Sequence, residues 1–460
     1  MNHEFSNLIE KQRLYFNSQA TKEVSFRKEA LRQIKNEIKI REKEICNALK
    51  KDFCKSEFES VLSEIGILQI ELDLIINNLA KWSRPESKIP SLLNFPSTDK
   101  IYKEPYGVTL VIAPWNYPFQ LALAPLIGAI AAGNTAVLKP SELTPHTSSV
   151  VTSIIESLFD EEYIAVVNGG VEVSQALLAQ RWDYIFFTGS VAVGKIVAKA
   201  AAENLTPVTL ELGGKNPCII DATANLKLAA KRIVWGKFFN GGQTCIAPDY
   251  ILIDTKVKDE FTSLITVEIE KAYGKNPKAS IDYPRIINER NFDRLTKMLV
   301  NENIVYGGQH EKENLYIAPT LFNNPSLESA VMKEEIFGPI LPIISYNNIN
   351  QVHKTIDHYE KPLSLYIFST NSKFITTIIH KHSFGGGAIN DTMIHFGNHR
   401  LPFGGIGHSG LGAYHGKATF DVFSHKKPVV KKANWLDIPV RYAPYQGKLK
   451  TLKFFLKYFR

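Results

Sequence analysis

One cysteine of the chain stands where a nucleophile could work. Cys245 ends residues 241–245, Gly-Gly-Gln-Thr-Cys, and the two glycines permit a tight turn just before the thiol. A thiolate attacks carbonyl carbon well, but a lone cysteine is more often an inert buried thiol. That inert description fits the other three cysteines, Cys46, Cys54 and Cys218. The glycine-rich setting therefore makes Cys245 the candidate nucleophile.

Two polar side chains at the ends of candidate strands could assist a thiol. Glu211 follows the apolar run 207–210 and precedes Leu-Gly-Gly-Lys. Its carboxylate could act as a general base, or it could be a structural acid paired with Lys215. Asn116 lies in Pro-Trp-Asn-Tyr-Pro, after the candidate strand 108–113, where its amide could donate to a developing oxyanion or merely form a turn.

One strand-to-helix turn is suited to bind an anion. Residues 187–194, Phe-Thr-Gly-Ser-Val-Ala-Val-Gly, lead from an apolar strand through a glycine turn into a helix. Unpaired backbone N–H groups and the helix dipole meet at such a turn, which suits a pyrophosphate. The spacing matches neither the Rossmann fingerprint nor a Walker A loop, and a turn without a ligand has the same pattern.

Two further motifs could hold the rest of a dinucleotide. Lys139 and Glu142 follow another candidate strand and could hydrogen-bond ribose hydroxyls, where Glu142 would also repel a 2′-phosphate. The alternative is a strand end followed by a helix start. Glu335 and Phe337 lie at a break before the candidate strand 340–345, which could be no more than a surface turn.

The elements that must position these residues alternate between strands and helices. From residue 108 to residue 210, short β-rich runs alternate with helical stretches, which predicts a parallel, doubly wound α/β sheet with ligands at the carboxyl ends of its strands. Residues 4–80 show helical periodicity, and four prolines between 83 and 105 favour an extended arm. A second α/β set is predicted from candidate strands 218–220, 250–253, 340–345, 364–368 and 388–389.

Size and composition limit the class of protein. A chain of 460 residues, 44% of them hydrophobic, suits roughly three globular domains. Four cysteines without zinc-ligand spacing indicate a reducing compartment, and the absence of a signal peptide or long apolar run predicts a cytoplasmic protein. The late histidines, among them His395 and His399, lack acidic or thiol neighbours in the sequence, so we expect no metal.

The net charge of +8 resides in the C-terminal tail. Residues 425–460 hold ten Lys or Arg against one acid, which leaves 44 basic and 45 acidic residues elsewhere. The body therefore lacks the electrostatic footprint of a nucleic-acid-binding protein. As a helix, residues 448–460 would place Leu449, Leu452, Phe455, Leu456 and Phe459 on one side. Such a basic amphipathic helix could lie on an anionic membrane or dock on the protein body.

Taken together, the motifs PWNYP, KPSE, FTGSVAVG, ELGGK, GQTCIAPDY, EEIFGP and PFGGIGHSGLGAYHG resemble those of the aldehyde dehydrogenase superfamily, most closely its class 3 branch of fatty and aromatic aldehyde dehydrogenases. The resemblance spans nearly the whole chain. It implies that Cys245 attacks the aldehyde, that Asn116 and the Cys245 N–H hold the oxyanion, and that Glu211 activates the water that hydrolyses the thioester. It also implies a nicotinamide dinucleotide, NAD or NADP, bound by Trp115, Lys139, Glu142, Gly189, Ser190, Val193, Gly194, Glu335 and Phe337.

The resemblance also suggests a domain division and a partner. Residues 1–82 and 106–209 would form the dinucleotide-binding domain, 210–395 the catalytic domain, and 83–105 with 396–426 a small β oligomerisation arm of a homodimer, with 427–460 as the basic amphipathic tail. Two alternatives to hydrolytic oxidation stay open: a coenzyme A-acylating dehydrogenase, and a protein that keeps the fold without turnover.

Overall fold

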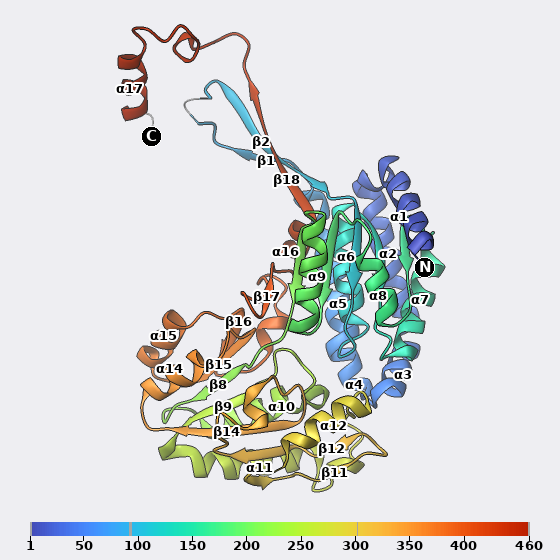
Figure 1. Ribbon diagram of the computed structural model, residues 1–460, viewed down its shortest axis with the longest axis vertical. Helices are drawn as coiled ribbons and strands as arrows, with labels where there is room; N and C mark the ends of the chain where they lie inside the picture. Colours follow the sequence, from blue (N-terminus) through green and yellow to red (C-terminus); the bar gives the residue numbers. More distant parts are fainter. Residues whose placement is uncertain (1, 92–93, 301, 459–460) are drawn as a thin grey trace.

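Two α/β lobes and a long arm make up the molecule (Figure 1). The computed structural model describes residues 2–91, 94–300 and 302–458. The arm extends from the first lobe and carries the C-terminal helix at its far end, whereas the N-terminus lies on the first lobe (Figure 1).

The first lobe is built on a sheet with strand order β17-β7-β6-β3-β4-β5. All pairs are parallel except β17 with β7. The chain begins in the middle at β3, adds β4 and β5 on one side, and then adds β6 and β7 on the other, which confirms the predicted doubly wound sheet. The strands are β3 Val108–Ile112, β4 Thr135–Lys139, β5 Ile164–Val166, β6 Tyr184–Thr188, β7 Val208–Glu211 and β17 Gly410–Leu411.

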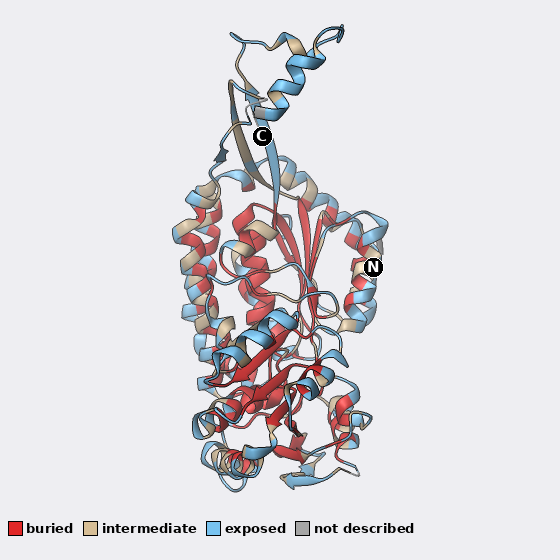
Figure 2. Cartoon of the chain, turned by 90° about the vertical axis from the view of Figure 1, so that its left-hand side faces the viewer, coloured by how far each residue is buried: buried red, intermediate tan, exposed pale blue. Residues whose placement is uncertain are grey.

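Alternate side chains of the central strand β3 enter different cores. Val108, Leu110 and Ile112 pack with one helical layer, and Val111 packs with the other, because successive strand residues point to opposite faces. The first layer contains α1 Asn2–Asn17, α8 Val171–Leu178 and α9 Val191–Glu203. The second contains α2 Val24–Ile40, α3 Glu42–Phe53, α5 Gly66–Trp82, α6 Gln120–Ala132 and α7 Pro145–Leu158. Figure 2 shows the buried strands between their helical layers.

A π-helical turn interrupts the N-terminal helices near the lobe boundary. The short helix α4 Glu57–Ser60 continues into the π-helix η2 Val61–Ile65 and then into α5. Such π-turns are rare and often occur at functional sites. Here the turn brings the side of this helix against the cavity described below.

The second lobe has a sheet of order β10-β13-β14-β9-β8-β15-β16, parallel except for the pair β10 and β13. Its strands are β8 Pro217–Ile220, β9 Tyr250–Asp254, β10 Ile304–Tyr306, β13 Thr320–Asn323, β14 Ile340–Tyr346, β15 Ser364–Phe368 and β16 Gly386–Ile389. Its helices are α10 Leu226–Phe238, α11 Lys258–Tyr273, α12 Glu289–Met298, α13 Ala330–Lys333, α14 Ile349–Asp357 and α15 Ser372–Lys381. The sequence missed β10 and β13, as well as the small hairpin of β11 His310–Glu311 and β12 Tyr316–Ile317.

The chain returns to the first lobe after the second is complete. Phe403, Tyr414, Phe420 and Phe423 join the same core as α2, α5 and α6, and α16 Lys417–Val422 lies against α6. The assignment of all of residues 396–426 to the arm was therefore wrong, because their aromatic side chains fill the core of the first lobe.

The arm itself is a three-stranded antiparallel sheet of β1 Glu86–Lys88, β2 Ser97–Pro105 and β18 Ser424–Lys432. Strand β18 pairs with β2 along its whole length, from Ser424 opposite Pro105 to Lys432 opposite Ser97. Residues 427–432 were therefore wrongly assigned to the tail. Their lysines and Pro428 look like a solvated tail in the sequence, but both residue types also occur on edge strands. Beyond β18 the helix α17 spans Leu449–Tyr458, and Phe459 lies outside the described residues.

Candidate active site

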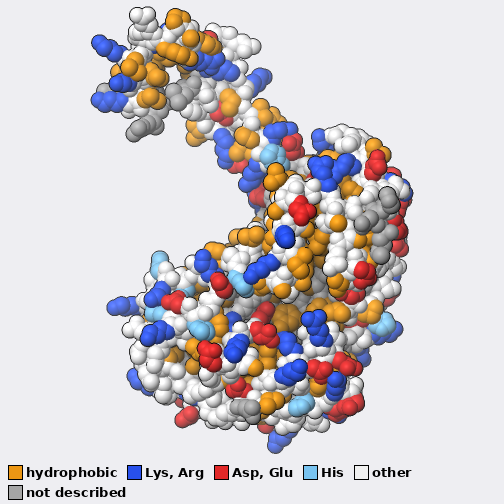
Figure 3. Space-filling view, in the orientation of Figure 1, with side chains coloured by type: hydrophobic (Ala, Val, Ile, Leu, Met, Phe, Trp, Pro, Cys, Tyr) orange, Lys and Arg blue, Asp and Glu red, His pale blue; other side chains and the backbone are white. Residues whose placement is uncertain are grey.

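A cavity of about 1410 Å³ lies where the two lobes meet. Figure 3 shows hydrophobic side chains gathered at this junction. The strand ends of β6 and β7, the turn after β3 and the segment before β9 all contribute to its wall. Ordinary small-molecule pockets occupy about 300–1,000 Å³, so the cavity has room for more than one ligand.

Cys245 reaches the cavity at the end of a loop with an unusual backbone. After α10, the 3-10 turn Phe239–Gly242 includes three successive residues with left-handed φ, namely Asn240 at 54°, Gly241 at 62° and Gly242 at 75°. A Cβ at Gly242 would stand 2.3 Å from the carbonyl oxygen of Gly338, so only glycine fits there. The glycines noted in the sequence thus turn the chain so that the part-exposed Cys245 lines the cavity.

Asn116 lies beside this loop and is bonded to it. Its Nδ2 donates to the carbonyl oxygen of Gln243 at 3.0 Å. The amide has a second N–H, and Asn116 lines the same cavity as Cys245. The neighbouring Tyr117 hydroxyl forms a 2.6 Å hydrogen bond with the Thr244 hydroxyl. The two motifs that carry the candidate oxyanion donor and the candidate nucleophile are therefore held together by two side-chain hydrogen bonds.

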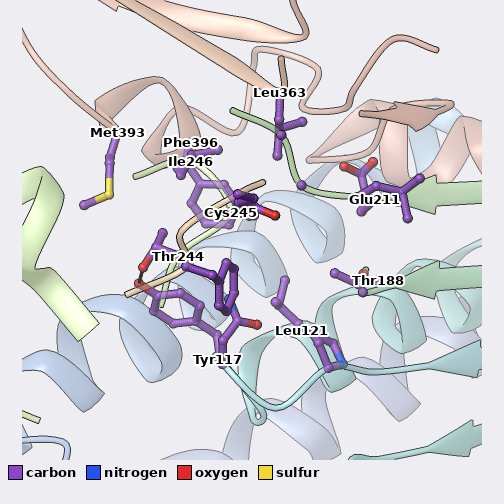
Figure 4. A pocket seen from close by; sticks show the side chains of 18 of the residues that line it. Tyr117, Leu121, Thr188, Glu211, Thr244, Cys245, Ile246, Leu363, Met393 and Phe396 are labelled. Carbon is purple, nitrogen blue, oxygen red and sulfur yellow. Dashed lines mark hydrogen bonds between the residues drawn. The ribbon is translucent and has the colours of Figure 1, made fainter. Parts of the chain in front are cut away.

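Glu211 faces the cavity from the end of β7 (Figure 4). The side chain is buried, and neither carboxylate oxygen has a hydrogen-bond partner among the described residues. Burial raises the pKa of this carboxyl well above 4.5. The alternative pairing with Lys215 was wrong, because Lys215 Nζ donates to Asp249 Oδ2 at 2.6 Å instead. An unpaired buried carboxyl in a cavity suits a proton acceptor.

The surroundings of Cys245 shift the pKa of its thiol. Burial raises its pKa above 9.0, and the carboxylates of Glu335 and Glu211 raise it further, whereas the N–H groups of Cys245 and Ile246 lower it. The same two N–H groups lie close to the sulfur. They could therefore also donate to the oxyanion that forms when the sulfur attacks a carbonyl carbon.

The strand-to-helix turn after β6 forms the other side of the cavity. Gly189 and Ser190 line it, and the Ser190 hydroxyl caps α9 by accepting from the N–H of Val193 at 3.4 Å. The hydroxyl of Thr188, beside them, is buried without a hydrogen-bond partner among the described residues. Val193 and Gly194 follow on α9, whose thirteen residues direct their dipole to this end. The turn therefore has the donors that a phosphate needs.

Trp115 and Phe337 meet across the cavity with ring centroids 5.3 Å apart. Glu335, two residues before Phe337, lies against Gly213, where an added Cβ would stand 2.1 Å from its Oε2. Burial raises the pKa of Glu335 to about 8. Lys139 and Glu142 are joined at 2.5 Å at the end of β4, outside the residues that line the cavity.

A match to a family model decides the family of the chain. The model of the aldehyde dehydrogenase family matches residues 2–429. The chain belongs to the aldehyde dehydrogenase family. It is an oxidoreductase that acts on aldehydes.

Several relatives resemble the enzyme over nearly its whole length. The 4,4'-diaponeurosporen-aldehyde dehydrogenase of Staphylococcus aureus is 48% identical over 98% of this chain and 100% of that protein. Aldehyde dehydrogenase family 3 member A2 of Rattus norvegicus is 44% identical, over 97% of this chain and 93% of its own. A solved substrate-bound state of Staphylococcus aureus AldH has a TM-score of 0.96 and 47% identity, and covers 98% of this chain and 99% of that one. The resemblance to the class 3 branch is thereby confirmed.

Sequence reasoning missed the side chains that support the site of the enzyme. Lys215 binds the carbonyl oxygens of Val331 and Glu334 at 2.9 Å, and Asp249 accepts from the N–H of Ile336 at 3.0 Å, so this buried pair holds the Glu335 turn. The sequence also did not indicate the apolar wall of the cavity, which comes from distant segments and includes Leu62, Ile67, Ile70, Leu121, Trp235, Phe239, Ile394 and Phe396. The only signal for Tyr117 and Thr244 was their place within quoted motifs.

The structure also shows the surroundings of the other three cysteines and of His399. Cys46 and Cys218 are buried, but Cys54 is exposed, which corrects its assignment as a buried thiol. Cys54 has a φ of 59° and ends α3. His399 lies beside the buried Glu71 carboxylate, and the described residues contain no cluster of three His, Cys, Asp or Glu side chains arranged to hold a metal.

Within the described part of the chain, no helix is long and apolar enough to span a membrane.

Proposed function

We propose that the enzyme oxidises apolar aldehydes, medium- or long-chain aliphatic or aromatic, to carboxylic acids through a thioester on Cys245. The observation that carries the proposal is that Cys245, Asn116 and Glu211 line one cavity with a dinucleotide-type turn at one side and an apolar wall at the other. The alternatives of coenzyme A acylation and of a protein without turnover are outcomes of the test below.

In the proposed reaction, the Cys245 thiolate adds to the aldehyde carbon and the carbonyl oxygen becomes an oxyanion. The second N–H of Asn116 and the backbone N–H of Cys245 stabilise that oxyanion. The bond of Asn116 to Gln243 fixes the amide so that this N–H needs no reorientation. A bound nicotinamide dinucleotide supplies the acceptor for the hydride that leaves the same carbon. The carbon is then joined to sulfur as a thioester.

Glu211 serves as the base of the second step. A water molecule gives its proton to the Glu211 carboxylate and its oxygen to the thioester carbon, which releases the carboxylic acid and restores the thiolate. The raised pKa makes Glu211 a stronger base than an exposed glutamate. Because no described residue pairs with it, both oxygens are available for water.

The residues around the first strand ends fit a dinucleotide. Gly189, Ser190, Val193 and Gly194 provide a turn and a helix N-terminus for the pyrophosphate, with the unpartnered Thr188 hydroxyl beside them. Trp115, Glu335 and Phe337 would lie at the nicotinamide end. Lys139 and Glu142 would hold the adenine ribose, and Glu142 favours NAD over NADP. A relative from Canis lupus familiaris, 40% identical, is named a dimeric NADP-preferring aldehyde dehydrogenase, so we propose NAD with NADP as a second cofactor.

The wall of the cavity supports an apolar substrate. Ile67 and Ile70 from α5 and Trp235 from α10 line it beyond Cys245. Together with Leu62, Leu121 and Phe396 they form an apolar lining that suits a hydrocarbon chain or an aromatic ring. The relative from Staphylococcus aureus is named a 4,4'-diaponeurosporen-aldehyde dehydrogenase.

The arm and tail support two further parts of the proposal. Strand β18 leaves an unpaired edge with exposed Val429 and Val430, which suits pairing within a homodimer. The helix α17 exposes Leu449, Leu452 and Leu456 beside several lysines, which suits peripheral contact with the anionic cytoplasmic face of a membrane. A reducing, cytoplasmic location would also keep Cys245 as a free thiol.

Decanal oxidation tests the central proposal. NADH formation should be measured in wild type, Cys245→Ala and Glu211→Gln, with and without coenzyme A. We expect no turnover in Cys245→Ala, and in Glu211→Gln one NADH per site followed by steady turnover slowed about 100-fold, since loss of a general base costs about 10² to 10⁴ in rate. An undiminished rate in Cys245→Ala would overturn the mechanism. Restoration of Glu211→Gln by coenzyme A, with acyl-coenzyme A as product, would favour the acylating alternative.

A further inference from the structure

Three charged side chains from the N-terminal helices are buried beside the active-site loops. Lys55, Glu59 and Glu64 lie on or next to α4 and η2, and all three are at most 6% exposed. The proposed reaction uses none of them. Because burying charges is costly unless they are engaged, each should have a structural or functional partner.

Lys55 and Glu64 engage one another and the start of α6. Lys55 Nζ contacts Glu64 Oε1 at 2.5 Å. The other oxygen of Glu64 accepts from the N–H groups of Phe119 and Gln120 at 2.9 and 3.2 Å, at the N-terminus of α6. Lys55 also lies 4.2 Å from the centre of the Tyr117 ring. This pair therefore secures the turn that carries Asn116.

Glu59 makes a different contact, on the nucleophile loop. Its Oε2 accepts a hydrogen bond from the backbone N–H of Asn240 at 3.2 Å. Asn240 is one of the left-handed residues that precede Cys245. A carboxylate that accepts from a backbone N–H holds that peptide in one orientation, and here the peptide belongs to a strained part of the loop.

The side chain of Asn240 links the two active-site motifs. Its Nδ2 donates to the carbonyl oxygen of Asn116 at 2.9 Å and to that of Gln243 at 3.2 Å. Asn116 in turn donates to the same Gln243 carbonyl. Glu59 thus holds the backbone of Asn240, and the side chain of Asn240 in turn sets the distance between the oxyanion donor and the nucleophile loop.

We propose that Glu59 is a positioning residue of the aldehyde dehydrogenase reaction, acting through Asn240 to hold Asn116 in register with Cys245. The inference rests on the proposed function of Asn116 and Cys245. It assigns to the N-terminal helices a part in transition-state stabilisation in addition to packing. A displacement of the oxyanion donor weakens stabilisation of the transition state more than binding of the aldehyde, so loss of Glu59 should lower kcat and leave KM nearly unchanged.

Substitutions at both ends of the link test the proposal. Glu59→Leu removes the acceptor, Glu59→Gln keeps an acceptor oxygen, and Asn240→Gly keeps the left-handed backbone but removes the linking amide. Glu57→Leu, on the exposed side of the same helix, is the matched control. We expect Glu59→Leu and Asn240→Gly to lower kcat for decanal about tenfold, with KM within about twofold of wild type, and Glu59→Gln to retain most of kcat.

A double-substitution cycle identifies the route. If Glu59 acts through Asn240, adding Glu59→Leu to Asn240→Gly should change kcat by less than about twofold. Equal effects of Glu59→Leu in both backgrounds would overturn the proposal, as would kcat within twofold of wild type in Asn240→Gly. Should Glu59→Leu fail to fold, Glu59→Ala takes its place in the same cycle. Cys245→Ala separates the two levels, because its activity would refute the proposed function, whereas its inactivity beside unchanged Asn240→Gly would refute only the role of Glu59.

Discussion

At the residue scale, the burial of Glu211 sets its chemistry and also its effect on stability. The carboxyl has no hydrogen-bond partner among the described residues, and its pKa is raised by burial alone. A buried charge without a partner destabilises the folded state. The proposed base is thus held in a position that a purely structural residue would not occupy, which is the pattern expected where function opposes stability.

This conflict predicts that stability depends on pH through Glu211. Above pH 4.5 the unfolded chain ionises Glu211 more readily than the folded protein does, so the free energy of unfolding falls as pH rises towards the folded pKa. Relative to wild type, Glu211→Gln should therefore gain stability between pH 5 and pH 8, by about 1.4 kcal/mol for each unit of the pKa shift. Urea midpoints at both pH values measure the change. The exposed Glu203→Gln serves as control, and an equal response of the two variants would contradict the argument.

At the element scale, the turn between α10 and Cys245 depends on close backbone approach. Gly242 has a φ of 75°, and its Cα faces the Gly338 carbonyl in the turn that follows Glu335. The nucleophile loop and the turn that carries Glu335 and Phe337 therefore pack directly on one another. A side chain at this point would separate two parts of the active site.

We predict that Gly242→Ala is much more damaging than an alanine at a similar but open glycine. Gly274 has a φ of 76° and no atom closer than 4.0 Å to an added Cβ. Gly274→Ala should lower the free energy of unfolding by about 1 kcal/mol, the cost of left-handed alanine. Gly242→Ala adds overpacking and should cost about 2–4 kcal/mol with a loss of most activity. Thermal unfolding and decanal turnover measure both, and similar costs at the two positions would refute the packing argument.

The elements differ in how far the sequence predicted them. Strands β3 to β7 were predicted because each is a short apolar run between helices with clear periodicity. Strands β10 and β11 were not, because they are only two or three residues long and largely exposed, so no apolar pattern marks them. For the site, motifs predicted Cys245, Glu211 and Asn116, which line one cavity. The apolar wall and the contacts of Glu59 and Lys215 arise from residues far apart in the chain, which no local pattern records.

At the scale of the whole molecule, the arm and tail differ from the two lobes in the placement of their apolar side chains. The lobes enclose the buried apolar cores, whereas the arm and tail expose Val429, Val430, Trp435 and Leu449 together with many lysines. Exposed apolar side chains on an extended arm suit a surface that another molecule covers. The proposed occupants are a second copy at the sheet edge and a membrane at α17.

Removal of the tail should separate membrane contact from catalysis. A chain that ends at Lys432 keeps all of β18 and loses α17. We expect the intact protein to sediment with vesicles that contain phosphatidylglycerol, less so at 0.5 M salt because the charges are then screened, and the shortened chain to stay in the supernatant with unchanged decanal turnover. Equal sedimentation of both chains would refute the membrane contact of α17.

Pairing of two chains through the edge of β18 can be tested by measuring the mass of the protein in solution. Sedimentation equilibrium of the intact chain should give twice the mass of one chain. The pair Val429→Glu and Val430→Glu places like charges at the edge of β18 and should shift the mass towards that of a monomer. A monomeric wild type, or a variant that stays dimeric, would exclude pairing through this edge.

The return of the chain to the first lobe has a consequence for biosynthesis. Phe403, Tyr414, Phe420 and Phe423 complete a core whose other members begin at Ala30. A ribosome must therefore finish nearly the whole polypeptide before the N-terminal lobe can close around α6. At about 5–20 residues per second, the apolar face of that helix stays uncovered for tens of seconds. The nascent chain is thus a natural client for chaperones, and its yield in a cell should depend on them more than the stability of the finished protein suggests.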